Sequence, residues 1–281
     1  MTGPRDSSRR TVHVNGIDLN VVVAGSGPAV LLVHGFPDSL EVWRKQIPVL
    51  AAAGYTVIAP DLRGCGLSDA PAQRSAYRAE RLVADLLGLL DTLNVAEVRL
   101  VGHDWGAVIG WLFCCAHPER VDRYVALSVG HPGAYVHGSL EQKLKGWYVL
   151  FLQFPVVAER LLRARGWWMF RKLVRYPDEA QRWIANLSRP GRLTAAINYY
   201  RANLALLLRR DWPPVRVPVM GVWSDGDLFL VESQMLDSRR LVEGPFRYER
   251  VGHANHWLQL TAAERVNELL LDYLSSPPTS S

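Results

Sequence analysis

The sequence has few cysteines, no long apolar run and no apolar stretch near its start. Its three cysteines, Cys65, Cys114 and Cys115, are odd in number and two are adjacent, which excludes a disulfide framework. No apolar run approaches the roughly 20 residues that a membrane-spanning helix needs. Residues 1–10 are polar and hold three arginines with no apolar stretch behind them, unlike a secretory signal. We therefore expect a cytoplasmic protein with no transmembrane segment.

The composition is that of a folded chain with a modest excess of positive charge. Of its 281 residues, 49% are hydrophobic and 21% are charged, and the formal net charge is +5. This hydrophobic share, evenly spread, excludes a disordered chain. The basic residues thicken between residues 160 and 175, where we interpret them as a solvated helix face. Since there is no zinc-finger, basic coiled-coil or RNA-binding aromatic motif, we expect no nucleic-acid partner.

The first half of the chain alternates between strand and helix patterns. Asn15-Gly16, a strong signal for a tight turn, separates two β-rich runs and predicts a hairpin over residues 11–24. Further apolar, β-branched runs predict buried strands at residues 29–33, 55–59, 98–101 and 121–127. Apolar residues at helical spacing predict helices at residues 78–93 and 107–116. This alternation predicts a mostly parallel sheet with helices on both faces.

The alternation stops between residues 131 and 211 and then resumes. The intervening stretch is rich in aromatic residues, Leu and Arg, and it predicts helices broken near Pro155, Pro177 and Pro190. The patterns after it predict a strand, a helix, a strand and a helix at residues 217–223, 232–241, 246–251 and 262–274. We therefore predict an α/β core, residues 1–130 and 212–281, with an all-helical cap at residues 131–211. The ends, residues 1–10 and 275–281, are expected to be mobile.

The most informative motif is Gly-His-Asp-Trp-Gly at residues 102–106. It follows an apolar run and opens a helical pattern, which is the context of the G-x-S-x-G nucleophile elbow, with Asp104 in the serine position. The flanking glycines permit a sharp turn, and the N-terminus of the following helix favours a negative charge there. An Asp that merely caps a helix is the weaker interpretation, because capping requires neither the glycines nor the preceding strand.

A carboxylate at this position changes the accessible chemistry. A serine must lose a proton as it attacks, and it suits acyl carbons. A carboxylate is already anionic at neutral pH and can displace a leaving group at a saturated carbon. The product is an ester on Asp104, which water must then hydrolyse. That step requires a general base, normally a histidine oriented by a carboxylate, and donors that stabilise an oxyanion.

Candidates for the acid and the base follow later predicted strands. Residues 223–227 contain two candidate acids, Asp225 and Asp227, and the segment after the last predicted strand contains two histidines, His253 and His256. The chain order nucleophile, acid, histidine is the one expected of a fold with this elbow. Spacing alone leaves both choices open.

Over nearly its whole length the chain resembles α/β-hydrolases of the epoxide hydrolase type. The resemblance rests mainly on residues 34–37, 61–69 and 102–106. It implies the α/β-hydrolase fold, an α/β architecture with a mostly parallel eight-stranded sheet flanked by helices and an inserted helical cap. The His-Trp-Leu-Gln segment resembles the family's catalytic His-Trp-x-Gln, which favours His256 as the base. The family's acid usually precedes an apolar run, which favours Asp227.

The same resemblance implies the oxyanion donors and the acid groups. His-Gly-Phe-Pro resembles the family's oxyanion segment, which makes the backbone N–H groups of Phe36 and Trp105 the two donors. Soluble epoxide hydrolases use two cap tyrosines to protonate the epoxide oxygen, and their sequence contexts match Tyr148 and Tyr200 here. The position of Tyr199 is usually a packing aromatic. Ordinary core packing of both other tyrosines is the competing interpretation.

Two other functions fit parts of this pattern. A haloalkane or haloacid dehalogenase also uses an Asp nucleophile, and Trp105 could donate to its halide. A halide leaves without a proton, however, so that reaction needs neither Tyr148 nor Tyr200. A non-catalytic homologue that binds an apolar ligand under the cap would need no complete set of nucleophile, acid and base.

The expected partners are a small epoxide and water, with no metal or organic cofactor. Position in the chain suggests an apolar pocket that includes the two oxyanion residues. The further residues expected to bind substrate are His34, Pro37, Trp147, Phe151, Leu152, Phe154 and Trp257. The oligomeric state stays open, with a homodimer as one option.

Overall fold

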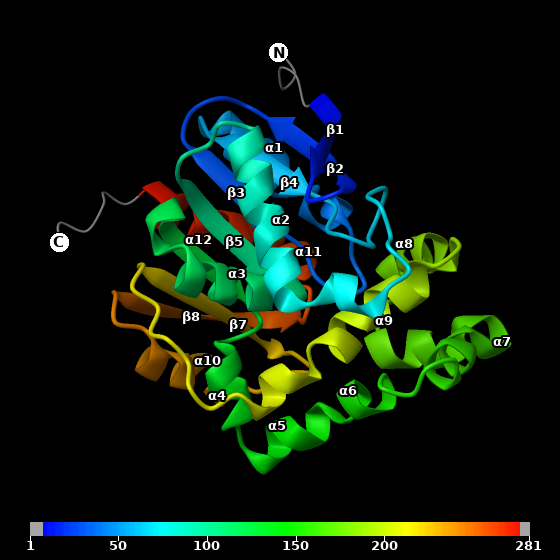
Figure 1. The fold of residues 1–281 in the computed structure, drawn as a ribbon. Helices are drawn as coiled ribbons and strands as arrows, with labels where there is room; N and C mark the ends of the chain where they lie inside the picture. Colours follow the sequence, from blue (N-terminus) through cyan, green and yellow to red (C-terminus); the bar gives the residue numbers. More distant parts are fainter. Residues whose placement is uncertain (1–7, 276–281) are drawn as a thin grey trace.

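The computed structural model describes residues 8–275, which fold around one eight-stranded sheet (Figure 1). The strands are β1 (Ser8–Val14), β2 (Ile17–Ala24), β3 (Ala29–Val33), β4 (Thr56–Pro60), β5 (Val98–His103), β6 (Val121–Leu127), β7 (Val219–Gly226) and β8 (Phe246–Asn255). Their order across the sheet is β1-β2-β4-β3-β5-β6-β7-β8. The pairs β1–β2 and β2–β4 are antiparallel and the other five are parallel, which confirms the predicted sheet.

The first hairpin forms where the sequence predicts it, and it corrects one expectation about the N-terminal end. Asn15 and Gly16 have φ angles of 48° and 75°, as a two-residue hairpin turn requires. The pairing continues back from this turn to Ser8, which lies opposite Val23. Residues 8–10, expected to be mobile, are therefore held in β1 by ladder hydrogen bonds. Ser275 likewise ends the last helix, and the rest of both ends lies outside the described residues.

Helices cover both faces of the sheet. The core helices are α1 (Ile47–Ala52), α2 (Ala79–Thr92), α3 (Trp105–Ala116), α10 (Glu232–Asp237), α11 (Leu258–Thr261) and α12 (Ala263–Ser275). Short 3₁₀ turns are η1 (Leu40–Trp43), η2 (Arg74–Tyr77), η3 (Pro118–Arg120) and η5 (Ser238–Leu241). In Figure 1, α2 and α3 lie in front of the sheet and α12 lies behind it. The helix predicted at residues 78–93 forms because its leucines at helical spacing are buried against this front face.

Between β6 and β7 the structure describes helices and loops. These helices are α4 (Pro132–Val136), α5 (Leu140–Lys145), α6 (Trp147–Phe151), α7 (Val157–Val174), α8 (Pro177–Ser188), α9 (Arg192–Ala202) and η4 (Leu204–Leu208). Helices α5 to α9 lie together on one side of the core (Figure 1), and we call them the cap. Helix α7 is interrupted at residues 164–167, where Arg165, Gly166 and Trp167 have positive φ angles. The domain limits at residues 131 and 211 stay a prediction.

The structure also describes the cysteines and the apolar character of the helices. Cys65, Cys114 and Cys115 all carry free thiols. Among the helices of residues 8–275, none combines the length and the apolar character that crossing a bilayer requires.

A buried ion pair ties the loop after β4 to helix α2. The Arg63 guanidinium donates to both carboxylate oxygens of Asp85 over 2.7 Å each, and both side chains are almost completely buried. The backbone carbonyl of Arg63 also accepts a 2.7 Å hydrogen bond from the Tyr199 hydroxyl of the cap. The pair therefore orients a loop on which the cap rests.

Replacing Asp85 by Ala should destabilise the protein strongly, because it leaves the Arg63 charge buried without a partner. We expect a loss of about 3–5 kcal/mol in the free energy of unfolding, measured by chemical denaturation. Asp91→Ala is the matched control, because Asp91 lies on the same helix and pairs with Arg120 at the surface. That change should cost no more than about 1 kcal/mol. Equal losses in the two variants would contradict the structural role of the buried pair.

Candidate active site

Asp104 lies in the sharp turn between β5 and α3. Its φ of 53° and ψ of −122° are unusual for a residue other than glycine, and such strain is typical of functional turns. A Cβ on Gly102 would lie 2.4 Å from the carbonyl oxygen of Gly106, and one on Gly106 would lie 2.0 Å from that of Val33. Both positions therefore need glycine. The turn holds the Asp104 side chain at the carboxyl edge of the sheet.

His256 lies between two carboxylates. Its Nδ1 is 2.8 Å from Oδ2 of Asp227, and its Nε2 is 3.5 Å from Oδ2 of Asp104. The other oxygen of Asp227 accepts hydrogen bonds from the backbone N–H groups of Phe229 and Leu230, at 2.8 and 3.0 Å. These bonds fix the carboxylate, which in turn orients the imidazole toward Asp104.

Asp225 and His253, the alternative candidates for the acid and the base, contact each other away from Asp104. The Asp225 carboxylate accepts a 2.8 Å hydrogen bond from the backbone N–H of His253, and both residues are exposed. Neither residue lines a cavity that contains Asp104. The geometry therefore brings Asp227 and His256 to Asp104 and leaves Asp225 and His253 at the surface.

Backbone donors hold one oxygen of the Asp104 carboxylate. The N–H of Phe36 donates to Oδ1 over 2.6 Å, and the N–H of Trp105 also hydrogen-bonds the carboxylate. The loop that contains Gly35 lies so close to Asp104 that a Cβ on Gly35 would be only 2.3 Å from Oδ1. Only glycine fits at this position. The carboxylate thus receives two backbone N–H donors, with Phe36 bound to Oδ1, while Oδ2 lies 3.5 Å from Nε2 of His256.

The charges of this group stabilise one another. Burial alone would raise the pKa of Asp104, but the hydrogen bond and charge of His256 hold it below its usual value. Burial alone would lower the pKa of His256, but the charge of Asp227 and the hydrogen bonds to both carboxylates raise it to about 10. At neutral pH the site therefore holds an imidazolium between two carboxylates.

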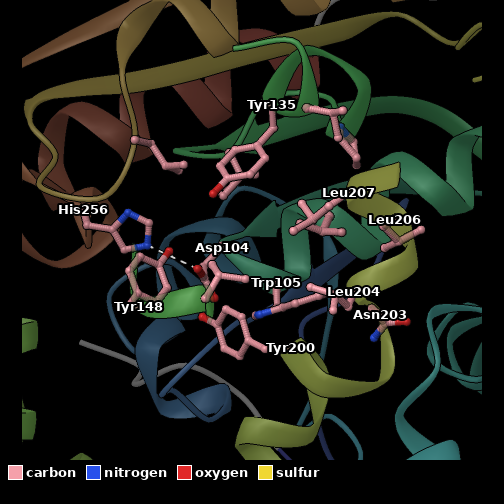
Figure 2. Close-up of a pocket in the computed structure, with 16 residues that line it drawn as sticks. Asp104, Trp105, Tyr135, Tyr148, Tyr200, Asn203, Leu204, Leu206, Leu207 and His256 are labelled. Atoms are coloured by element: carbon pink, nitrogen blue, oxygen red, sulfur yellow. Dashed lines mark ion pairs between the residues drawn. The ribbon is translucent and has the colours of Figure 1, made fainter. Parts of the chain in front are cut away.

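An apolar cavity of about 100 Å³ opens beside this group (Figure 2). Besides Asp104 and His256, it is lined by Trp105, Val108, Val129, Pro132, Tyr135, Val136, Tyr148, Val149, Tyr200, Asn203, Leu204, Leu206, Leu207 and Leu230. A smaller chamber of about 20 Å³ adjoins Asp104, and Phe36, Pro37, Leu173, Phe229 and Trp257 are among its lining residues. Most of the lining carries no polar group, as small-molecule sites generally do.

Two cap tyrosines face Asp104. Tyr148 comes from α6 and Tyr200 from α9, their rings lie 6.0 Å apart, and both phenol oxygens point toward Asp104 (Figure 2). Burial raises the pKa of Tyr148 and that of Tyr200 well above the usual value, so both keep their protons. Tyr199, interpreted from the sequence as a packing residue, directs its hydroxyl to the carbonyl of Arg63 instead.

The buried Arg201 holds the helix that carries Tyr200. It pairs through two nitrogens with the Glu159 carboxylate, at 2.6 and 3.0 Å, and it donates to the carbonyls of Leu152 and Phe154. These bonds join α9 to the start of α7 and to the loop between α6 and α7.

Five of the residues that the sequence suggested for substrate binding line neither the larger cavity nor the smaller chamber. His34 is buried, but its imidazole bonds the backbone of Leu62 and Gly35 and lines neither chamber. Trp147 and Phe154 are 50% and 60% exposed because their sides of α6 and of the following loop face outward. Leu152 and Phe151 pack within the cap. Pro37 and Trp257 line the smaller chamber, as does Phe36, while Trp105 lines the larger cavity.

Sequence patterns did not reveal several residues of the site. Tyr135 of α4 points its hydroxyl toward the same space as Tyr148 (Figure 2), and leucines of η4 form one wall of the cavity. Single apolar residues in a Leu-rich stretch carry no distinguishing signal. Asp38 is also buried at the site, where the indole N–H groups of Trp183 and Trp257 donate to it over 2.7 and 3.0 Å.

Asp38 joins the cap to the core. Trp183 belongs to α8 of the cap and Trp257 directly follows the catalytic histidine candidate, so one carboxylate bridges both parts. Burial raises the pKa of Asp38 to about 8 despite these donors.

Across residues 8–275, no group of three or more His, Cys, Asp or Glu side chains is arranged to hold a metal ion.

Comparisons with known proteins agree with this architecture. Residues 28–263 match the model of the alpha/beta hydrolase fold family. The chain is 33% identical to epoxide hydrolase 3 of Xenopus tropicalis, over 92% of this chain and 75% of that protein. It is 38% identical to epoxide hydrolase 2 of Siraitia grosvenorii, over 79% of this chain and 81% of that protein.

Solved structures give the same result. A crystal structure of an epoxide hydrolase from Vigna radiata matches with a TM-score of 0.82 and 29% identity, covering 95% of this chain and 97% of that one. An epoxide hydrolase from Bacillus megaterium matches with a TM-score of 0.86 and 26% identity, covering 95% and 100%. The chain belongs to the α/β-hydrolase fold family, among relatives that include these epoxide hydrolases.

Proposed function

We propose that this protein is an enzyme that hydrolyses epoxides to vicinal diols through a covalent ester on Asp104. One observation carries the proposal: the Asp104 carboxylate, paired with His256, faces the hydroxyls of Tyr148 and Tyr200 across an apolar cavity. The names of its relatives support the same activity. Asp227 serves as the acid that orients the base.

In the first step, Oδ2 of Asp104 attacks an epoxide carbon and the bond from that carbon to the epoxide oxygen breaks. Tyr148 and Tyr200 hydrogen-bond this oxygen, and one of them gives it a proton. A protonated donor is required because an alkoxide is a poor leaving group. Tyr148 and Tyr200 are such donors, because their raised pKa values keep both phenols neutral until the ring opens.

Esterification then converts His256 into a base. It removes the negative charge of Asp104, which helps to hold the proton on the imidazole, so the pKa of His256 falls. The proton it releases replaces the one lost by the tyrosine, which restores the charge balance. Neutral His256 then takes a proton from water as that water attacks the ester carbonyl. The tetrahedral intermediate collapses, the bond from the ester carbon to the diol oxygen breaks, and His256 gives that oxygen its proton. The diol leaves, and the new Asp104 carboxyl passes its proton to His256, which restores the starting state. The N–H groups of Phe36 and Trp105 stabilise the resulting oxyanion.

The shape of the site favours apolar epoxides with one larger substituent. The larger cavity, of about 100 Å³, offers an apolar wall built by residues such as Leu204 and Leu207, whereas the chamber lined by Leu173 and Phe229 measures only about 20 Å³. A dehalogenase would use the same nucleophile but would gain nothing from two phenol donors. We therefore rank it below the epoxide hydrolase.

The variant His256→Gln should accumulate the ester, because it retains the nucleophile and lacks the base. With a terminal aliphatic epoxide we expect the wild type to form diol and this variant to lose about 10²–10⁴-fold in turnover. Mass spectrometry should find the adduct on the peptide that contains Asp104, and Asp104→Ala should form neither adduct nor diol. The exposed His253→Gln is the matched control and should keep normal activity. Halide release from alkyl halides without diol formation from epoxides would overturn the proposal.

Loss of the phenol donors should slow ring opening more than ester hydrolysis. We expect Tyr148→Phe or Tyr200→Phe to slow single-turnover ester formation by about 10- to 100-fold, and the double variant by more. Tyr199→Phe removes a neighbouring buried hydroxyl that faces Arg63, so it should affect stability and leave ring opening unchanged. A double variant with a nearly normal rate of ester formation would refute the role of the pair.

Neutralising the nucleophile should lower the pKa of His256. In the wild type this pKa is raised to about 10, partly by the charge and hydrogen bond of Asp104. Asp104→Asn imitates the uncharged ester, so the imidazole should lose its proton at a lower pH. Titration of the ¹⁵N-labelled histidines by NMR measures this shift, with His253 as the internal reference. An unchanged pKa for His256 would contradict the proposed activation of the base.

A further inference from the structure

The exposed apolar side chains of residues 8–275 gather on one part of the cap. Thirteen large apolar side chains are exposed, and nine of them fall within residues 140–168. These nine are Leu140, Leu144, Trp147, Leu150, Phe154, Val156, Val157, Leu161 and Trp168. Isolated exposed apolar residues are ordinary, but a concentration of them marks an interaction surface. Helices α5, α6 and α7 run along the outer edge of the cap, away from the sheet (Figure 1).

The same segment carries the positive charge of the protein. Residues 139–175 contain eight Lys or Arg and two Asp or Glu, a net charge of +6 against +5 for the whole chain. Seven of the eight basic side chains are exposed. Of the two acids, Glu159 is bound by the buried Arg201 and Glu141 lies 3.4 Å from Lys145. We call the exposed side chains of residues 140–175 the outer cap face.

Apolar and basic groups alternate within this face. On the first part of α7, Val157, Arg160 and Leu161 are all exposed and lie at helical spacing. Arg163 lies over the ring of Trp167, 5.9 Å from its centre. Helical surfaces that combine Trp, Leu and Phe with Lys and Arg are typical of segments that lie in a membrane interface.

A groove lies between this face and the active site. Its volume is about 310 Å³, and its lining includes Lys145, Trp147, Lys172 and Arg175, together with Tyr148, Leu173 and Phe229. The last three residues also line the small chamber beside Asp104. The groove and the chamber therefore share a wall, and the basic side chains surround the outer part of the groove.

We infer that the outer cap face docks on the surface of a bilayer that contains anionic lipids. A second copy of this chain fits less well, because a twofold interface at this face would bring +6 against +6. Lipid phosphates and carboxylates complement the basic residues, and the apolar side chains enter the boundary between headgroups and acyl chains. Docking in this way places the groove against the lipid, from which apolar epoxides reach Asp104. Only this delivery of substrate rests on the proposed function.

Sedimentation with vesicles tests the docking directly. The wild type should bind vesicles of equimolar phosphatidylcholine and phosphatidylserine, and it should bind phosphatidylcholine alone much more weakly. The variant K143Q/R160Q/R163Q should bind the anionic vesicles more than about tenfold more weakly. The control R10Q/R216Q/R240Q removes the same charge from exposed residues outside the cap and should bind as the wild type does. Weak binding by the wild type, or equal losses in both triple variants, would overturn the inference.

The apolar contribution has its own test. Leu161→Ser with Trp168→Ser should weaken binding to the anionic vesicles, whereas Leu67→Ser with Leu236→Ser, exposed outside residues 140–175, should not. If ultracentrifugation shows a dimer that the first pair of changes dissociates, this face is instead a contact between copies. With a long-chain epoxide dissolved in vesicles, the cap variants should lose turnover that they retain on a water-soluble epoxide. Vesicle binding without any diol formation would overturn the proposed function and leave the docking intact.

Discussion

The turn that carries Asp104 runs so close to neighbouring backbone that side chains are excluded at three positions. Gly102 and Gly106 allow the turn to pack against its own helix and the end of β3, and Gly35 lets a second loop reach the carboxylate. The same closeness brings the N–H of Phe36 to Oδ1 of Asp104. The unusual backbone angles of Asp104 are held by this packing, and the direction of the nucleophile follows from them.

Around this turn, the arrangement of charge decides what the residues can do. A buried carboxylate or imidazole alone would tend to lose its charge, but the contact between His256 and Asp104 lowers the pKa of the carboxyl and raises that of the imidazole, so both stay charged. The charge on the imidazole depends on both carboxylates. When Asp104 becomes an ester in the proposed reaction, His256 loses the negative charge that helps to raise its pKa. A nucleophile and a base can therefore share one small site and act in sequence.

The cap contributes both to this site and to the outer surface. Its inner side is fixed to the core by the bonds from Trp183 to Asp38 and from Tyr199 to Arg63, which position α8 and α9. Tyr148 and Tyr200 face inward from this frame. The outer side of α5, α6 and α7 carries the exposed apolar and basic residues. The positive charge noticed in the sequence is thus a property of one face of the cap.

Much of this protein follows from patterns along the chain. Short apolar, β-branched runs locate the strands and apolar residues at helical spacing locate the helices, because strands inside a parallel sheet are buried on both faces and helices on one. The glycines around Asp104 and the order of the acid and histidine locate the elbow and its partners, because a sharp turn and a shared sheet edge restrict residue type. The predicted domain limits rest on where the alternation of strands and helices stops and resumes, whereas the roles of the tyrosines rest on resemblance. Spacing could not choose between Asp225 and Asp227.

Packing between distant segments accounts for the rest. The side of α6 that faces inward depends on how the cap helices rest on the core, so Tyr148 lines the cavity while the adjacent Trp147 faces outward. Cap loops likewise expose Phe154, which sequence position had suggested for the pocket. Leucines of η4 line the cavity only because that segment crosses beside Asp104. The protonation of His256 depends on two carboxylates far apart in sequence, and the distances between such groups are a property of the folded chain.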